Sequence, residues 1–194
     1  MTASKACRRA LIVSVGDKLY EHFSQLLPRP DFYPAIRARS AGEARRILSQ
    51  SPVDLLIVDT PLPDEFGVDF ALSMADRTMG ILMVVKADLY DQVSCQVEDQ
   101  GILTVSKPNS RQVLCSSVKL LAALSARLQK MEQKNQSLQE KMADIRAVNR
   151  AKWLLIDRCN MSEKDAHYFI EKQAMDARVP RRKVADNIIR SYDG

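Results

Sequence analysis

The chain of 194 residues has no apolar run that approaches the roughly 20 residues needed by a transmembrane helix. Its basic N-terminus leads into an apolar stretch, but that stretch breaks at Gly16 and Asp17 and has no small-residue cleavage site. A signal peptide needs both a longer apolar core and such a site. We therefore expect a cytoplasmic protein that makes no membrane contact.

Cysteine is scarce, and its scattered positions argue against disulfides and metal centres. The four cysteines at positions 7, 95, 115 and 159 form no CxxC pair, and neither histidine lies at ligand spacing from one of them. Disulfide frameworks and zinc sites show regular cysteine spacing, so we interpret these residues as free thiols. The sequence also has no Gly-rich phosphate loop and no nucleophile–base pair. We predict no catalytic residue, no metal ligand and no enzyme.

Glycine and proline are absent from Ser110 to Val179. Because these residues most often interrupt helices, the stretch can form one continuous helix, and residues 111 to about 158 follow a helical apolar pattern. The apolar positions step by four and three, which is the heptad spacing of a two-stranded coiled coil. The predicted dimer seam consists of Leu121, Leu124, Leu128, Met131, Asn135, Leu138, Met142, Ile145 and Asn149.

Two asparagines and two like charges indicate how this coil would pair. Asn135 and Asn149 fall at heptad position a, where a buried amide pair favours two parallel strands in register, so we predict a homodimer. Across a parallel pair Lys141 would repel Arg146, and the coil should loosen toward its C-terminal end. The alternative is a lone helix that lays its apolar stripe on its own domain, although the seam is narrow and long for that role.

Residues 9 to about 109 alternate between short apolar runs and helical patterns. Such alternation is typical of a parallel sheet covered on both faces, so we predict a doubly wound, flavodoxin-like α/β domain with five strands. Pro34 would place its strand at an edge of the sheet. The expected strands are 10–15, 32–38, 53–58, 80–85 and 102–105, and the expected helices are 17–27, 40–48, 67–74 and 88–99. Ser40 is the predicted N-cap of the second of these helices, with Glu43 three residues on completing a capping box.

The C-terminal residues indicate two further helices. Ser162 is a predicted N-cap with Asp165 in the first turn, and Pro180 lies where the first turn of the last helix would start. Together with the end of the long helix, they predict a three-helix bundle. The predicted domains are residues 1–109, a coiled-coil linker at 110–140, and residues 141–194.

The stretches "VDLLIVDTPLPDEFG" and "SKPNS", together with the strand order, resemble a response-regulator receiver domain. In that family an aspartate at the end of the third strand accepts a phosphoryl group, and a lysine after the fifth strand pairs with the phosphate. The resemblance implies that Asp59 is the phosphoacceptor candidate and that Lys107 belongs to the receiver pocket. The alternative role for Asp59 is a strand-end carboxylate that only pairs with Lys107.

Other positions depart from the receiver pattern. The family holds Mg²⁺ with two acids after the first strand, but this chain has Ser14 and Val15 there, and its nearest carboxylate is Asp17. The hydroxyl residue expected at the end of the fourth strand falls at or near Val85. Since Mg²⁺ prefers oxygen ligands, we expect no cofactor and no ordinary Mg²⁺-dependent phosphorylation. Mg²⁺ would bind only if a pocket that includes Asp17 and Lys107 is functional.

The stretches "NRAKWLLIDR", "MSEKDAHYFIEKQAMDAR" and "RKVADNII" resemble the ANTAR domain, an RNA-binding antiterminator module. The resemblance implies binding to paired stem-loops in nascent leader RNA, which prevents a terminator from forming. RNA hairpins offer phosphates to cations and unpaired bases to aromatic rings. The RNA-binding candidates are Lys152, His167, Tyr168, Arg178, Arg181, Arg182 and Lys183, and the net charge of +5 is compatible with them.

Some of these candidates have alternative structural roles. Tyr168 could pack in the core, and the cluster from Arg181 to Lys183 could be a solvated helix start. We read Ala151, Ala166, Ala174, Met175, Val184 and Ala185 as close helix-packing positions.

These features predict a dimeric antitermination regulator that is controlled through its receiver-like domain. A sensor kinase or a ligand-sensing regulatory protein could supply the input. One alternative is a DNA-binding two-component response regulator phosphorylated on Asp59. Its helix-turn-helix would usually have a tight turn that often contains glycine, whereas the stretch "DARVPRRK" in this chain has none. A structural hub that uses only the coiled coil is another alternative.

Overall fold

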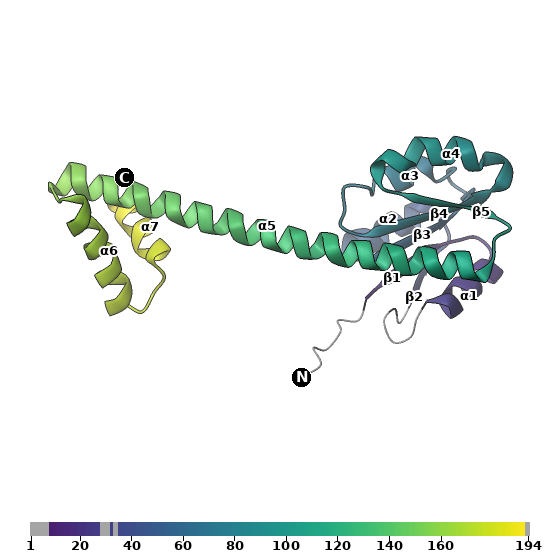
Figure 1. Cartoon of the computed structure of the whole chain (residues 1–194), viewed down its shortest axis with the longest axis horizontal. Helices are drawn as coiled ribbons and strands as arrows, with labels where there is room; N and C mark the ends of the chain where they lie inside the picture. The colour runs from purple at the N-terminus through teal and green to yellow at the C-terminus, as the bar shows by residue number, and fades with distance from the viewer. Residues whose placement is uncertain (1–7, 28–31, 33–34, 193–194) are drawn as a thin grey trace. The chain divides into compact units, whose positions relative to one another are not determined.

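The computed structural model describes residues 8–27, 32 and 35–192. It divides into an N-terminal unit up to Lys130 and a C-terminal unit from Met131, so the boundary falls inside helix α5 (Arg111–Cys159) (Figure 1). The domain boundaries expected from the sequence, at 109 and 140, stay predictions. No helix among the described residues is both long and apolar enough to cross a membrane.

The N-terminal unit is built on a five-stranded parallel sheet, as predicted. The strand order β2-β1-β3-β4-β5 puts the second strand at an edge, which agrees with the sequence pattern, although Pro34 itself lies outside the described residues. The strands are β1 (Ala10–Val13), β2 (Ala35–Ala38), β3 (Leu55–Asp59), β4 (Gly80–Lys86) and β5 (Leu103–Lys107).

The helices form two layers because alternate strand residues point to opposite faces of the sheet. In β1, Leu11 and Val13 pack on one face, whereas Ala10 and Ile12 pack on the other. The first face is covered by α2 (Ala41–Gln50), α3 (Val68–Leu72) and α4 (Tyr90–Val97), and the second by α1 (Asp17–Leu26) and the first turns of α5. Short 3₁₀ turns, η1 (Ala87–Leu89) and η2 (Glu98–Gln100), flank α4.

Helix α2 begins at a cap that also ties down the loop after β3. The Ser40 hydroxyl accepts a hydrogen bond from the Glu43 amide at 3.1 Å, which confirms the predicted N-cap. The Asp64 carboxylate accepts bonds from the amides of Ala41 (3.0 Å) and Gly42 (2.8 Å). A carboxylate at the positive end of a helix is favourable, and these bonds hold the pKa of Asp64 below its usual value. The loop that follows Asp59 is therefore anchored to α2.

Helix α5 lies unusually close to β4. A Cβ atom added to Gly80 would come within 2.9 Å of the Leu121 Cβ, so glycine is the residue that permits this approach. Polar contacts fix the helix further along: the Ser125 hydroxyl donates to the Thr78 carbonyl at 2.8 Å, and the Gln129 amide donates to Asp54 at 2.7 Å. The first turns of α5 are thus part of the core of the N-terminal unit.

This packing corrects one residue of the predicted dimer seam. Leu121 is only 3% exposed and packs in the core on the second face, so it cannot line an interface with another copy. The sequence pattern at this end resembles a coiled coil because the buried positions of a helix that packs in a domain core also recur every three and four residues. The exposed large apolar residues of α5 are Val113, Leu120, Leu124, Leu128, Met131, Leu138, Met142, Ile145 and Trp153.

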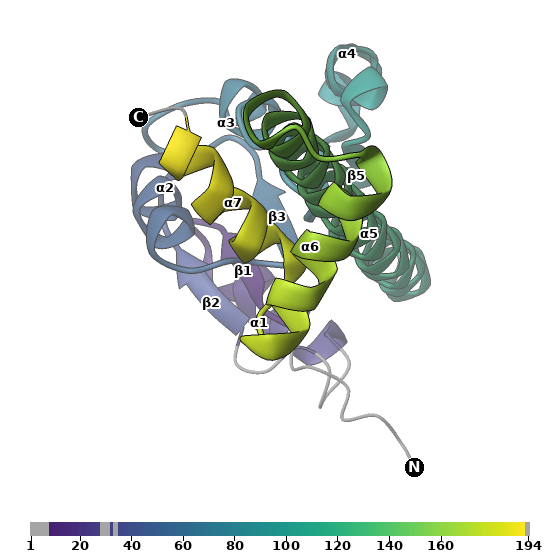
Figure 2. The same ribbon diagram turned by 90° about the vertical axis from the view of Figure 1, so that its left-hand side faces the viewer.

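The C-terminal unit packs the end of α5 against α6 (Glu163–Asp176) and α7 (Arg181–Tyr192), which lie side by side (Figure 2). Its core contains small residues that let the helices approach closely, and Ala151, Ala166 and Ala185 are fully buried. The Ser162 hydroxyl accepts from the Asp165 amide at 3.2 Å, which confirms the predicted N-cap. Met175 was expected to pack between helices, but this expectation is wrong because Met175 is 77% exposed.

We predict that Gly80→Ala destabilises the N-terminal unit. The new methyl group would meet both the Leu121 side chain and its carbonyl oxygen, at 2.9 and 3.1 Å, so α5 must move away from β4. Overpacking of this kind costs about 1–3 kcal/mol. Urea unfolding monitored by circular dichroism measures the loss.

Gly42→Ala is the matched control, because Gly42 lies within a helix and a Cβ there makes ordinary contacts with the Asp64 carboxylate at 3.5 Å and the Ser40 hydroxyl at 4.0 Å. Alanine has the higher helix propensity, so this variant should be unchanged or more stable by up to about 1 kcal/mol. Equal effects of the two substitutions would contradict the proposed close approach.

Candidate functional site

Asp59 and Lys107 meet at the carboxyl edge of the sheet. The Lys107 ammonium group, at the end of β5, donates to one carboxylate oxygen of Asp59, at the end of β3. The same ammonium group donates to the Thr60 carbonyl at 3.2 Å. The Asp59 side chain is 15% exposed, so this ion pair is largely shielded from solvent.

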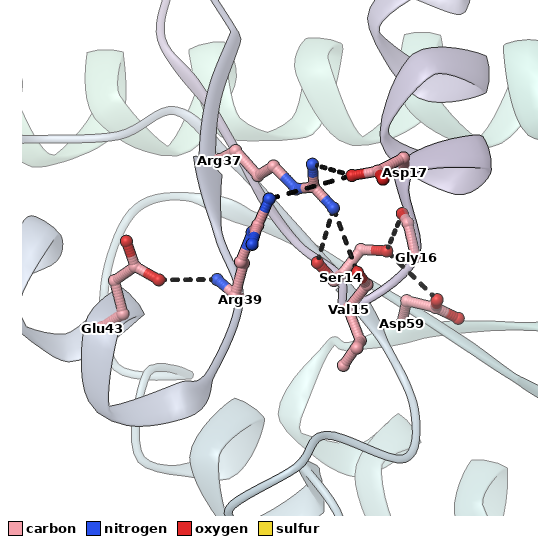
Figure 3. Close-up of polar contacts among 8 residues, drawn as sticks. All are labelled: Ser14, Val15, Gly16, Asp17, Arg37, Arg39, Glu43 and Asp59. Atoms are coloured by element: carbon pink, nitrogen blue, oxygen red, sulfur yellow. Dashed lines mark hydrogen bonds and ion pairs between the residues drawn. The ribbon is translucent and has the colours of Figure 1, made fainter.

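Ser14 occupies the other side of the Asp59 carboxylate. Its hydroxyl lies 3.3 Å from the second oxygen of Asp59 and 3.0 Å from the Gly16 carbonyl, and the residue is fully buried (Figure 3). Both oxygens of Asp59 therefore have partners within the protein. This arrangement satisfies a partly buried carboxylate without a bound ion.

Arg37, on the edge strand β2, dominates the loop between β1 and α1 (Figure 3). Its guanidinium group donates to the Asp17 carboxylate at 2.5 Å and to the Val15 carbonyl at 3.1 Å. It also lies over the Tyr20 ring, 5.1 Å from the centroid. The arginine therefore cross-links the loop that would carry the acidic pair of a receiver domain.

Asp17 takes part in this cross-link rather than in the Asp59 pocket. Its carboxylate points toward Arg37, with Arg39 a further 4.0 Å contact, and its side chain is 71% exposed (Figure 3). The hydrogen bond and the charge of Arg37, with a smaller effect of Arg39, lower the pKa of Asp17 below its usual value. Of the two predicted pocket residues, the structure brings Lys107 to Asp59, while Asp17 faces the edge strand.

The residues around Asp59 do not supply a ligand set for Mg²⁺. Ser14 and Val15 stand where two carboxylates would be needed, and Val85 is fully buried in the apolar core beside β3. Within residues 8–27, 32 and 35–192, no group of three or more His, Cys, Asp or Glu side chains could hold a metal ion.

The sequence analysis missed Arg37. Its signal is an arginine between apolar neighbours in the short strand "AIRA", where a charged side chain needs a specific partner.

The outer face of α6, defined here as Lys164, Tyr168, Lys172 and Met175, presents apolar and cationic groups to solvent. Tyr168 is 64% exposed and Met175 is 77% exposed, which rules out the alternative that Tyr168 packs in the core. The spacing i, i+4, i+8 and i+11 keeps these residues on one side of the helix, opposite the buried Ala166 and Ile170. Lys164, Lys172 and Met175 were missed as candidates, although their spacing from Tyr168 was readable in the sequence.

The predicted RNA-binding cations fall into two groups. Three of them form ion pairs: Lys152 with Glu163 (3.1 Å), Arg181 with Glu171 (2.8 Å), and Arg182 with Asp186 (2.9 Å). His167 lies 3.4 Å from Glu171 as well.

Arg178 and Lys183 form the second group. Both are exposed near the connection between α6 and α7, and neither has an ion pair among the described residues. Arg178 has a left-handed backbone (φ 52°) at the end of α6, and its amide donates to the Met175 carbonyl at 3.2 Å. These two cations and the outer face of α6 are therefore available to an anionic ligand.

We predict that Asp17→Asn flattens the acid side of the stability profile. Because the folded pKa of Asp17 is lower than its unfolded value near 3.8, the ionised carboxylate stabilises the fold above that value, and this contribution is lost as the pH falls through the folded pKa. Urea unfolding between roughly pH 5 and pH 2 should show a smaller loss for the variant than for the native chain.

Arg37→Gln removes the same contact from the other side and should flatten the profile by a similar amount. The double variant should add little to either single change, because both remove one interaction. A fully additive effect would mean that Arg37 does not lower the Asp17 pKa.

The C-terminal part of the chain and the chain as a whole are similar to known regulators. Residues 136–189 match the family model described as the ANTAR domain. The transcriptional regulatory protein PdtaR of Mycobacterium tuberculosis is 25% identical over 183 residues, which cover 94% of this chain and 89% of that protein. The aliphatic amidase regulator of Pseudomonas aeruginosa is 26% identical over 141 residues, 71% of each chain.

Solved structures resemble the N-terminal part of the chain. The signal receiver domain of an HD domain-containing protein from Pseudomonas fluorescens superposes with a TM-score of 0.58 at 20% identity, covering 67% of this chain and 96% of that one. A response regulator receiver domain protein from Clostridium thermocellum gives a TM-score of 0.55 at 17% identity, covering 62% and 98%. Residues 136–189 of the chain therefore match an ANTAR domain, and they follow in sequence a domain with a receiver-like fold.

Proposed function

We propose that this protein is a transcription antitermination regulator that binds stem-loops in nascent leader RNA. The observation that carries the proposal is the outer face of α6, where a solvent-exposed tyrosine and methionine lie beside two lysines within the ANTAR domain. Two similar proteins are named as regulators, which supports a regulatory role rather than catalysis. On this proposal the protein acts in the cytoplasm.

RNA contact on this face would combine two physical effects. An exposed Tyr168 ring can stack on an unpaired loop base, a contact worth about 1–3 kcal/mol. Lys164, Lys172, Arg178 and Lys183 can neutralise phosphates of the stem, which releases counterions and makes binding salt-dependent. Lys152, Arg181 and Arg182 contribute less on this proposal, because a phosphate would have to compete with their carboxylate partners.

The exposed stripe of α5 supports a homodimer. Leu124, Leu128, Met131, Leu138 and Met142 are each 44% to 58% exposed, and such a row of apolar residues on one helix is unfavourable in water unless another surface covers it. A parallel coiled coil would cover it and would carry two ANTAR domains. Two domains on one coil bind two stem-loops with a gain from effective concentration.

The receiver-like domain acts, on this proposal, without Mg²⁺-dependent phosphorylation. A phosphoryl donor carries negative charge, and Asp59 already has Lys107 and Ser14 as partners with no second carboxylate to hold a metal ion. The input is then a protein contact, from a ligand-sensing regulatory protein or a sensor kinase that acts by binding. The exposed residues of this domain are available for that contact.

The proposal predicts a preference for RNA. A leader RNA with two hairpins should bind in a gel shift, while duplex DNA of the same sequence should bind at least tenfold more weakly. Tyr168→Ala should weaken RNA binding by about 1–3 kcal/mol and Tyr168→Phe should restore most of it, because the stacking ring is kept. The slope of the logarithm of the RNA-binding constant against the logarithm of the salt concentration should become shallower by about one in Arg178→Gln and in Lys183→Gln.

Tyr192→Ala is the matched control, since Tyr192 is also an exposed aromatic residue of this domain but lies at the end of α7. It should leave RNA affinity unchanged. Equal affinity for duplex DNA would favour a DNA-binding regulator instead, and a dimer without salt-dependent RNA affinity would favour a structural hub.

A second prediction concerns Asp59. Incubation with acetyl phosphate and Mg²⁺ should yield no phosphorylated protein by mass spectrometry, because the residues around Asp59 provide no ligand set for the metal ion. Asp59→Asn should leave antitermination in a reporter assay within about twofold of the native level, provided that its melting temperature shows a folded protein. Loss of induction in a folded variant would rule out the phosphate-independent mechanism.

A further inference from the structure

Trp153 is the only tryptophan of the chain, and it is 64% exposed in the last third of α5. Large aromatic side chains gain most from burial, and exposed tryptophans often become anchors of protein interfaces. Trp153 packs in none of the three apolar cores of the described residues. The packing of its own three-helix core therefore does not account for a tryptophan at this position.

A pocket of about 450 Å³ lies on the same ANTAR domain, where α5, α6 and α7 meet. Its volume is within the range of ligand-binding cavities. The side chains from α5 include Ile145, Val148, Asn149 and Lys152, and the opposite wall includes Pro180 and Arg181. Two of these residues, Ile145 and Asn149, also belong to the predicted dimer seam, so a second copy on the seam would reach the pocket.

The heptad register says which residue of the second copy would arrive there. With Asn149 at position a, Val148 takes position g and Trp153 takes position e of the next heptad. In a parallel coiled coil a g residue faces the following e residue of the partner helix. We propose that Trp153 of the partner subunit enters this pocket, and that Trp153 of the first subunit enters the equivalent pocket of its partner. The inference rests on the parallel dimer of the proposed function.

The chemistry of the pocket suits an indole ring. Lys152 and Arg181, which line it, are held by Glu163 and Glu171, and Arg182 is held by Asp186. These pairs orient three of the cations, while Lys141, which also lines the pocket, has no ion pair among the described residues. Guanidinium and ammonium groups still attract the face of an aromatic ring, tryptophan most strongly.

The contact would also stabilise the predicted coil at a point where like charges destabilise it. Lys141 and Arg146 repel each other across a parallel pair, which would loosen the helices just before the ANTAR domains. A buried tryptophan one heptad further along would hold the two domains together at that point. The two ANTAR domains would then have a fixed arrangement, while the outer face of α6 stays open to RNA.

The single tryptophan provides the test. In the full-length protein, intrinsic fluorescence should shift to shorter wavelength and acrylamide quenching should fall at least twofold as the concentration rises through the dimer dissociation constant measured by sedimentation. Trp153→Ala should weaken dimerisation about tenfold or more, as expected for an interface anchor. Arg181 lies outside the coil, so Arg181→Gln should leave the dimer intact. It should increase acrylamide quenching of Trp153 in that dimer.

Two controls separate this inference from the rest. Tyr168→Ala removes an equally exposed aromatic residue and should leave the dimer dissociation constant unchanged. Leu138→Glu should give a monomer in which acrylamide quenches the tryptophan equally well at every protein concentration, as expected for an exposed side chain. The proposal is overturned if the dimer and this monomer show the same emission and quenching, if no dimer forms, or if RNA alone protects Trp153 in the monomer. RNA affinity, measured on the same samples, reports separately on the proposed function.

Discussion

The close approach of α5 to β4 is the contact on which the rest of the molecule depends. Gly80 leaves no side chain between the two backbones, so Leu121 packs directly against the strand. A helix has only one side toward a sheet, and burial of Leu114, Val118 and Leu121 forces Leu120, Leu124 and Leu128 to face solvent. The phase of the exposed stripe is therefore set by the receiver-like core. The beginning of α5 completes one helical layer of the N-terminal unit, and the residues that follow expose an apolar surface.

The sheet edge around Asp59 keeps a receiver-like arrangement of strand ends but gives the carboxylate different neighbours. The strand-end aspartate and the lysine keep their places because the parallel sheet brings their strand ends to one edge. The positions that would hold a metal ion instead contain a serine bonded to Asp59 and a loop cross-linked by Arg37. The carboxylates of Asp59 and Asp17 both have partners inside the protein, whereas the buried Nε of Arg37 has no hydrogen-bond partner among the described residues.

Charge pairing divides the ANTAR domain into two surfaces with different chemistry. Lys152, Arg181 and Arg182, which line the pocket, form ion pairs with neighbouring carboxylates, whereas Arg178 and Lys183 are exposed without ion pairs in the described part of the domain. An ion pair with an exposed carboxylate contributes little stability, but it orients both side chains.

The sequence by itself determined the alternation of strands and helices, the caps at Ser40 and Ser162, and the residues Asp59 and Lys107. The alternation and the caps follow from local periodicity and from backbone hydrogen bonds within a few residues, whereas Asp59 and Lys107 follow from the resemblance to a receiver domain. It also determined the heptad spacing, but that spacing does not distinguish a core-facing helix from a coiled coil, which is why Leu121 was assigned to the seam. Only the tertiary structure decided that Arg37 meets Asp17, that Met175 faces solvent, and which cations have carboxylate partners. Those outcomes depend on residues far apart in the chain, whose distances are set by packing rather than by sequence spacing.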